Sequence, residues 1–84
     1  MSQKPKELVL YAFDACPFCQ KVFRKITSLG IESTIVRKDT RIHPEYAREL
    51  IALNGTTQVP CLVIDGVPML ESDDINDYLD RTFG

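Results

Sequence analysis

The sequence has no hydrophobic run long enough to cross a membrane. Its longest apolar run, Leu8–Phe13, has six residues, whereas a membrane-spanning helix needs about 20. No small-residue cleavage site follows this run, so it does not resemble a secretory signal either. We therefore expect a cytoplasmic protein without a membrane partner.

A concentrated basic region is also missing. The formal net charge is −2, and the isoelectric point is near 5.2. Residues 1–60 carry nine Lys or Arg against six Asp or Glu, whereas residues 61–84 carry one Arg against six acids. Neither part has a long run of like charges. Because phosphate binding needs a concentrated basic face, we predict no nucleic-acid partner.

Repeats, low-complexity tracts and linkers are absent, so we expect one domain over residues 1–84. A chain of this length buries roughly 60% of its unfolded surface, enough for one modest core. A composition of 44% hydrophobic and 26% charged residues is typical of a globular protein. We expect this domain to act as a monomer.

Hydrophobic patterning predicts an α/β domain. Continuous apolar runs indicate buried strands, and apolar residues at helical spacing indicate helices. Pro17 and Pro44 suit the first turns of helices, and Gly30 and Gly55 suit helix ends. Asp65-Gly66 is typical of a hairpin turn. The order β-α-β-α-β-β-α follows, with strands at 8–13, 33–37, 61–64 and 67–70, and helices at 17–29, 44–54 and from Ser72, which we expect to cap the last helix.

The same patterns predict how the elements are arranged. The first two strands are joined through a helix and should be parallel, and the last two should form a hairpin. Pro68 lacks a backbone donor, which places the last strand at an edge. The predicted inward-facing helix residues are Phe18, Val22, Ile26 and Leu29, then Tyr46, Ala47, Leu50 and Leu53, then Ile75, Tyr78 and Leu79.

Three cysteines make a poor disulfide framework, because the number is odd and two of them lie three residues apart. Cys16-Pro17-Phe18-Cys19 follows the first strand and opens the first helix. A helix N-terminus favours an anion, so Cys16 should be a reactive thiolate. Cys19, one turn later, is close enough to form a disulfide with it. We expect the pKa of Cys19 to stay near its ordinary value of about 8.5.

The cysteines also have a metal-binding and a packing interpretation. Zinc would need four ligands, and His43 with Cys61 could complete the set. His43, however, precedes Pro44 at a helix start, where a surface position is expected, so we predict no metal. Cys61 points opposite to Pro60 and Leu62 along its strand, which favours a role in packing.

Two segments closer to the C-terminus can serve a ligand. Val59-Pro60 precedes a strand, and its spacing alone favours a loop proline with a trans bond. The segment from Leu70 to Asp74 begins the last helix. Its acids can simply complement the helix dipole. Alternatively, Ser72 and free amides suit a carboxylate, while Glu71 or Asp73 suits an ammonium group.

Taken together, Cys16–Cys19, Val59-Pro60 and the Asp73-Asp74-Ile75 helix start resemble the glutaredoxin family over nearly the whole chain. The resemblance implies a thioredoxin-like fold with a four-stranded mixed sheet of order 2-1-3-4. It also implies a cis Val59-Pro60 bond facing Cys16, and glutathione as reductant and co-substrate. The backbone of Val59 would pair with the cysteinyl part of glutathione, and Ser72 and Asp73 would hold its γ-glutamyl end.

Some residues depart from the glutaredoxin pattern. Phe13 stands where many glutaredoxins have Lys, so the glycine carboxylate could be held by Lys21, Arg37 or Arg41. Residues 64–79 are closer to the N-terminal domain of glutathione S-transferases, where a Glu-Ser pair binds the γ-glutamyl group. With 84 residues, we expect no room for the helical second domain of those enzymes.

We therefore expect an enzyme, a dithiol glutaredoxin that reduces glutathione mixed disulfides and protein disulfides. Cys16 and Cys19 would be catalytic, with Val59, Pro60, Glu71, Ser72 and Asp73 binding the substrate. The alternative is a non-catalytic glutathione-binding module or an iron–sulfur cluster carrier with the same fold. Pro17 after the nucleophile is typical of dithiol glutaredoxins, whereas cluster-binding relatives usually have Gly there.

Overall fold

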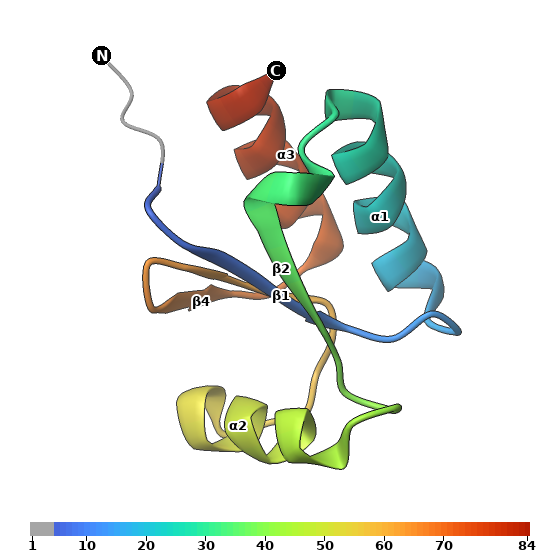
Figure 1. Cartoon of the computed structure of the whole chain (residues 1–84), viewed down its shortest axis with the longest axis vertical. Helices are drawn as coiled ribbons and strands as arrows, with labels where there is room; N and C mark the ends of the chain where they lie inside the picture. The colour runs from blue at the N-terminus through green and yellow to red at the C-terminus, as the bar shows by residue number, and fades with distance from the viewer. Residues whose placement is uncertain (1–4) are drawn as a thin grey trace.

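The computed structural model describes residues 5–84, which form four strands and three α-helices (Figure 1). A short 3-10 turn, Glu32–Thr34, precedes the second strand. No helix among residues 5–84 is long and apolar enough to span a bilayer. The elements in chain order are β1 (Leu8–Ala12), α1 (Pro17–Leu29), β2 (Ile35–Asp39), α2 (Pro44–Asn54), β3 (Cys61–Ile64), β4 (Val67–Met69) and α3 (Ser72–Phe83).

The four strands form one mixed sheet in the order β2-β1-β3-β4. β1 and β2 are parallel, β3 runs antiparallel to β1, and β4 pairs with β3 as a hairpin. Asp65 and Gly66 both have positive φ at the hairpin turn, as its sequence predicted. The predicted α/β thioredoxin-like fold and the edge position of Pro68 are confirmed.

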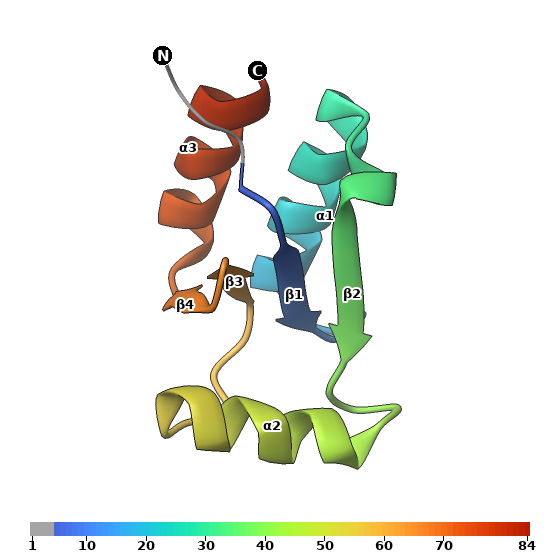
Figure 2. The same cartoon turned by 60° about the vertical axis from the view of Figure 1, so that its left-hand side comes forward.

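Helices cover both faces of the sheet. α1 and α3 lie side by side on one face, and α2 lies alone on the other (Figures 1 and 2). Because strand side chains alternate between faces, Leu10 and Leu62 pack toward α1 and α3. Tyr11, Cys61 and Val63 form a second cluster with Leu50 of α2. Ion pairs from Lys21 to Asp73 and from Lys25 to Asp80 further join α1 to α3.

Prolines and glycines set the helix bounds as predicted. Pro17 and Pro44 occupy the first turns of α1 and α2, and Gly30 and Gly55 follow the last turns with left-handed backbone conformations. β2, in contrast, begins two residues later than the predicted strand. Its position is fixed by parallel pairing from Leu8↔Ile35 to Ala12↔Asp39, and the sequence pattern does not reveal that register.

Three predictions about individual side chains are wrong. Phe18 is 60% exposed, because the buried face of α1 runs through Cys19, Val22 and Ile26. Leu53 is exposed, since α2 has only one fully buried residue, Leu50. Ser72 is the first residue of α3 and not its cap. The cap position is Glu71, which has φ 72° and makes no side-chain cap bond.

Candidate functional site

Cys16 lies at the N-cap of α1, as the sequence predicted. Its N–H donates to the carbonyl of Phe13 at 3.3 Å, which closes the loop that follows β1. Its sulfur accepts the N–H of Cys19 at 3.4 Å. Pro17 at the next position has no N–H to compete for this sulfur. A backbone donor and the N-terminal end of the helix dipole therefore meet at this one sulfur.

Cys19 lies deeper in the protein than Cys16, which is itself buried at 8% exposed. It is fully buried, 0% exposed, among the apolar residues that α1 presents to the sheet. Burial, above all, raises the pKa of Cys19 to about 12, and its interactions with Cys16 also act in that direction. The expectation that this pKa stays near its ordinary value is wrong, because Cys19 lies inside the core. The two cysteines therefore differ in place, with Cys16 at the helix cap and Cys19 as a neutral thiol inside the core.

A cleft of about 340 Å³ opens beside the N-terminal end of α1. All five predicted binding residues line it, although they come from two separate segments, the loop before β3 and the start of α3. The cysteines are not among its lining residues, but Val59 packs against the core cluster that contains both. The lining residues are Phe18, Lys21, Gln58, Val59, Pro60, Glu71, Ser72 and Asp73.

The Val59-Pro60 peptide bond is cis. This confirms what the resemblance implied and corrects the expectation from spacing alone. Pro60 is buried and Val59 is half-buried. Both reach the cleft just before β3 begins at Cys61.

The start of α3 supplies the polar wall of the cleft. Ser72 is only 7% exposed, and its hydroxyl has no hydrogen-bond partner among residues 5–84. The first-turn N–H groups of α3 receive no side-chain cap from Glu71. An unpartnered hydroxyl next to free N–H groups at a cleft can bind a carboxylate. The exposed Glu71 carboxylate can bind an ammonium group nearby.

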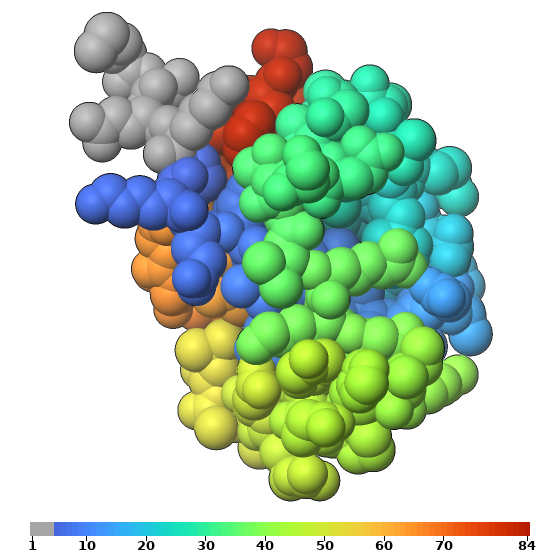
Figure 3. Space-filling model, viewed as in Figure 1, coloured from blue at the N-terminus to red at the C-terminus, as the bar shows by residue number. Residues whose placement is uncertain are grey.

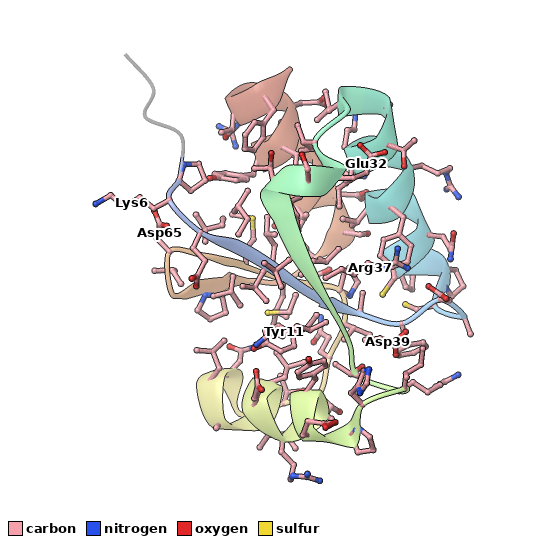
Figure 4. The ribbon with its side chains drawn as sticks, in the orientation of Figure 1. Lys6, Tyr11, Glu32, Arg37, Asp39 and Asp65 are labelled. Carbon is pink, nitrogen blue, oxygen red and sulfur yellow. The ribbon has the colours of Figure 1, made fainter. Side chains whose placement is uncertain are left out.

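The three cations considered for the glycine carboxylate occupy different places. Lys21 lines the cleft, and its amino group is 2.7 Å from a carboxylate oxygen of Asp73. Arg37 and Arg41 lie near the opposite edge of the sheet, on β2 and in the loop that follows it. Lys21 is therefore the cation that the cleft itself presents. Figure 4 shows Arg37 extending from β2 toward α1, whereas Tyr11 points toward α2.

Cys61 belongs to the other face of the sheet. It is fully buried against Tyr11, Leu50 and Val63, and burial raises the pKa of its thiol. Its predicted packing position is confirmed. Cys61 cannot join Cys16 and Cys19 in one zinc site from there, and residues 5–84 hold no cluster of three or more potential metal ligands.

Sequence reasoning missed the place of Phe18 in the cleft. Its place among regularly spaced apolar residues suggested a core position, but the buried face of α1 passes through the next residue, Cys19. The signal that could have found it is its place between the two cysteines. The adjacent Cys19, Val22 and Ile26 already account for a helix face with spacings of three and four.

Fold and site together define a thioredoxin-like domain with a helix-capping cysteine beside a polar cleft. Residues 10–84 match the family model described as the glutathione S-transferase N-terminal domain, and the chain belongs to this family. The transferase-like part of the resemblance is thereby confirmed.

Individual relatives agree with this family. The chain is 29% identical over 69 residues to human chloride intracellular channel protein 3, covering 82% of this chain and 28% of that protein. It resembles the structure of glutathione transferase Omega 3C from Trametes versicolor, with 27% identity and a TM-score of 0.77 over 96% of this chain and 35% of that one. It also resembles a glutathione S-transferase from Drosophila melanogaster, isozyme E7, with 28% identity and a TM-score of 0.72 over 93% of this chain and 35% of that one. The chain spans about a third of the length of these relatives.

Proposed function

We propose that this chain is a glutathione-dependent thiol–disulfide oxidoreductase of the glutaredoxin type. The observation that carries the proposal is the contrast between the two cysteines. Cys16 caps α1 and accepts an N–H on its sulfur, whereas Cys19 is a buried thiol one turn away. A nucleophile with a nearby resolving thiol suits disulfide exchange better than the hydrogen-bond activation of glutathione by transferases.

Glutathione is the ligand that suits the cleft. Its γ-glutamyl carboxylate would accept hydrogen bonds from the Ser72 hydroxyl and the first N–H groups of α3. Its ammonium group would face Glu71 and Asp73, and its cysteinyl part would extend along the backbone of Val59 toward Cys16. One neighbour with the same fold, a glutathione transferase homologue, was solved with bound glutathione.

The reaction is an exchange of sulfur bonds. The Cys16 thiolate attacks the glutathione sulfur of a mixed disulfide, and the substrate's sulfur leaves as a thiolate that takes a proton from solvent. A second glutathione thiolate then attacks the sulfur bound to Cys16, which releases oxidised glutathione and restores Cys16. With a protein disulfide, Cys16 attacks one sulfur and the other leaves as a thiolate that takes a proton from solvent. Cys19 then attacks the Cys16 sulfur of this mixed disulfide, and the protein's remaining cysteine leaves as a thiol with the proton that Cys19 loses. Two glutathione molecules reduce the resulting Cys16–Cys19 bond and form oxidised glutathione.

We further propose that residues 1–84 act as one monomeric domain on disulfide-containing or glutathionylated proteins. A reducing compartment such as the cytoplasm suits a protein with three free thiols.

The alternative is a glutathione-binding module without catalysis, or a carrier of an iron–sulfur cluster. Membership of the family described as the glutathione S-transferase N-terminal domain favours the first of these. A brown colour with visible absorbance in the purified protein would favour the cluster carrier.

Turnover of a small glutathione mixed disulfide, coupled to glutathione and glutathione reductase, tests the proposal directly. We expect steady turnover by the native protein and none by Cys16→Ser. Cys19→Ser should retain deglutathionylation and lose most reduction of a protein disulfide. If Cys16→Ser retains turnover while Cys19→Ser loses it on both substrates, the assigned roles are wrong.

A further inference from the structure

The loops after β1 and β2 leave the same end of the sheet, because the two strands are parallel. The N–H of Thr40 donates to the carbonyl of Ala12 at 3.0 Å and ties the loops together. The loop that begins at Phe13 and ends at Cys16 therefore borders residues 40–43. Figure 3 shows this face, with β2 running down its front toward α2.

Two arginines cover this junction. The guanidinium of Arg41 lies over the ring of Phe13, 4.1 Å from its centroid. The guanidinium of Arg37 lies over the ring of Phe23 at 3.5 Å and pairs with Asp14 in the loop before Cys16. Stacking on a phenyl ring holds each cation in place while leaving its charge accessible to solvent.

The two cations differ in how far they are neutralised. Arg37 shares its charge with Asp14. Arg41 is exposed, and its guanidinium has no carboxylate partner among residues 5–84. The carboxylate of Asp39 instead accepts the backbone N–H groups of Arg41 and Ile42, each at 2.8 Å, which orders the loop. Arg37 also lowers the pKa of Cys19, against the stronger effect of burial, so its charge is felt at the dithiol.

Charges on the opposite side of the cysteines have the other sign. Glu71, Asp73 and Asp74 are exposed at the start of α3, where Lys21 of α1 pairs with Asp73 and leaves the group acidic. A polypeptide bound near Cys16 therefore meets a cationic side at β2 and an anionic side at α3. Such a gradient orients charged partners and accelerates their association.

We propose that Arg41, supported by Arg37, selects glutathionylated polypeptides that carry acidic residues beside the modified cysteine. This inference rests on the proposed function and specifies its substrate class. Cys16 attacks the glutathione sulfur, the bond to the polypeptide's cysteine breaks, and the polypeptide leaves as a thiol after taking a proton from solvent. The acidic residues of the polypeptide lie along residues 37–41, while the glutathione part occupies the cleft.

The test uses three peptides with one cysteine in mixed disulfide with glutathione, flanked by three Glu, three Lys or three neutral residues. Mixing the reduced full chain with each peptide and quantifying the released peptide thiol gives a second-order rate constant for the first exchange. That step involves no free glutathione. At low salt we expect the acidic peptide to react about 10-fold faster than the basic one. This ratio should fall toward one near 0.5 M salt.

Variants of Arg41 test whether this residue causes the preference for the acidic peptide. Arg41→Gln should lower the ratio at least threefold, Arg41→Lys should retain most of it, and Arg41→Glu should invert it. Arg48→Gln makes the same charge change on exposed α2 and should leave the ratio unchanged. The neutral peptide should react at one rate in all variants.

Equal rates for acidic and basic peptides, or a preference that survives both Arg41→Gln and Arg41→Glu, would overturn the inference and leave the proposed function standing. If no peptide releases its thiol, the proposed function fails, and this inference fails with it.

Discussion

The two active-site cysteines should separate cleanly by their reactivity toward alkylating agents. Iodoacetamide reacts with the thiolate, and the pKa of about 12 leaves Cys19 almost entirely protonated at pH 8. Burial also raises the pKa of Cys61. Brief treatment of the native, reduced protein should therefore modify Cys16 alone, which peptide mass spectrometry would reveal. Modification of all three thiols in unfolded protein is the control. Equal labelling of Cys16 and Cys19 in folded protein would contradict the assignment.

Cys61 differs from the active-site pair because it contributes to packing alone. It is fully buried at the start of β3, where it packs against Tyr11 of β1 and Leu50 of α2. Cys61→Ser places a hydroxyl in that cluster and should lower the free energy of unfolding by about 1–3 kcal/mol. Denaturant unfolding measures this loss, and turnover by the variant's folded fraction should remain native. Cys61→Ala, which adds no polar group, is the matched comparison. A loss of turnover without a loss of stability would instead indicate a redox role.

The start of α3 is the element on which ligand binding depends. Ser72 brings a hydroxyl without a protein partner to the cleft, so Ser72→Ala removes one hydrogen bond to a bound carboxylate. We expect glutathione binding to weaken by about 1–3 kcal/mol. Calorimetric titration with glutathione measures the effect, and Ser33→Ala in the exposed 3-10 turn is the control. NMR shifts on glutathione addition that avoid residues 58–73 would refute this site.

The bounds of helices that begin at a proline and end at a glycine could be predicted from the sequence. The bounds of a strand that depend on pairing with another strand could not. Pro17 with Gly30 and Pro44 with Gly55 determine the bounds of α1 and α2 through backbone preferences that act within each segment. β2 depends on its register with β1, and Phe18 depends on which residues of α1 meet the sheet. These are properties of tertiary packing, which no single segment encodes.

In the candidate site, too, features that depend on adjacent residues could be predicted, whereas contacts between distant segments could not be derived from the residues alone. The position of Cys16 follows from the strand, the Cys-Pro pair and the helix, all adjacent in the chain. The meeting of Val59 and Pro60 with Ser72 requires the antiparallel placement of β3 and the hairpin, and it was expected only through the family resemblance. Lys21, Arg37 and Arg41 were equal candidates for a cation at the site in the sequence, and the placement of Arg37 and Arg41 beside the loop before Cys16 follows from the parallel pairing of β1 and β2.

For the whole molecule, the buried thiols predict lower stability in alkaline solution. The pKa of Cys19 is raised to about 12 and that of Cys61 is raised too, both chiefly by burial, so the folded state binds these protons more tightly than the unfolded state does. A raised pKa in the folded protein contributes stability that is fully present below the unfolded pKa of about 8.5 and is lost as pH rises toward the folded value. The free energy of unfolding should therefore fall above about pH 8.5, with a limiting slope of about 1.4 kcal/mol per pH unit for each thiol.

Urea unfolding of the reduced protein at intervals from pH 7 to pH 10 measures this slope. Tyr11, whose pKa burial also raises, ionises mainly above that interval, so the two thiols should dominate. Cys19→Ala and Cys61→Ala should each reduce the slope, and the double variant should unfold with little dependence on pH there. Alanine cannot ionise, so the stability lost with the side chain lowers the free energy of unfolding by the same amount at every pH and adds no slope. A slope that persists in the double variant would show that other groups control alkaline unfolding and that the buried thiols do not.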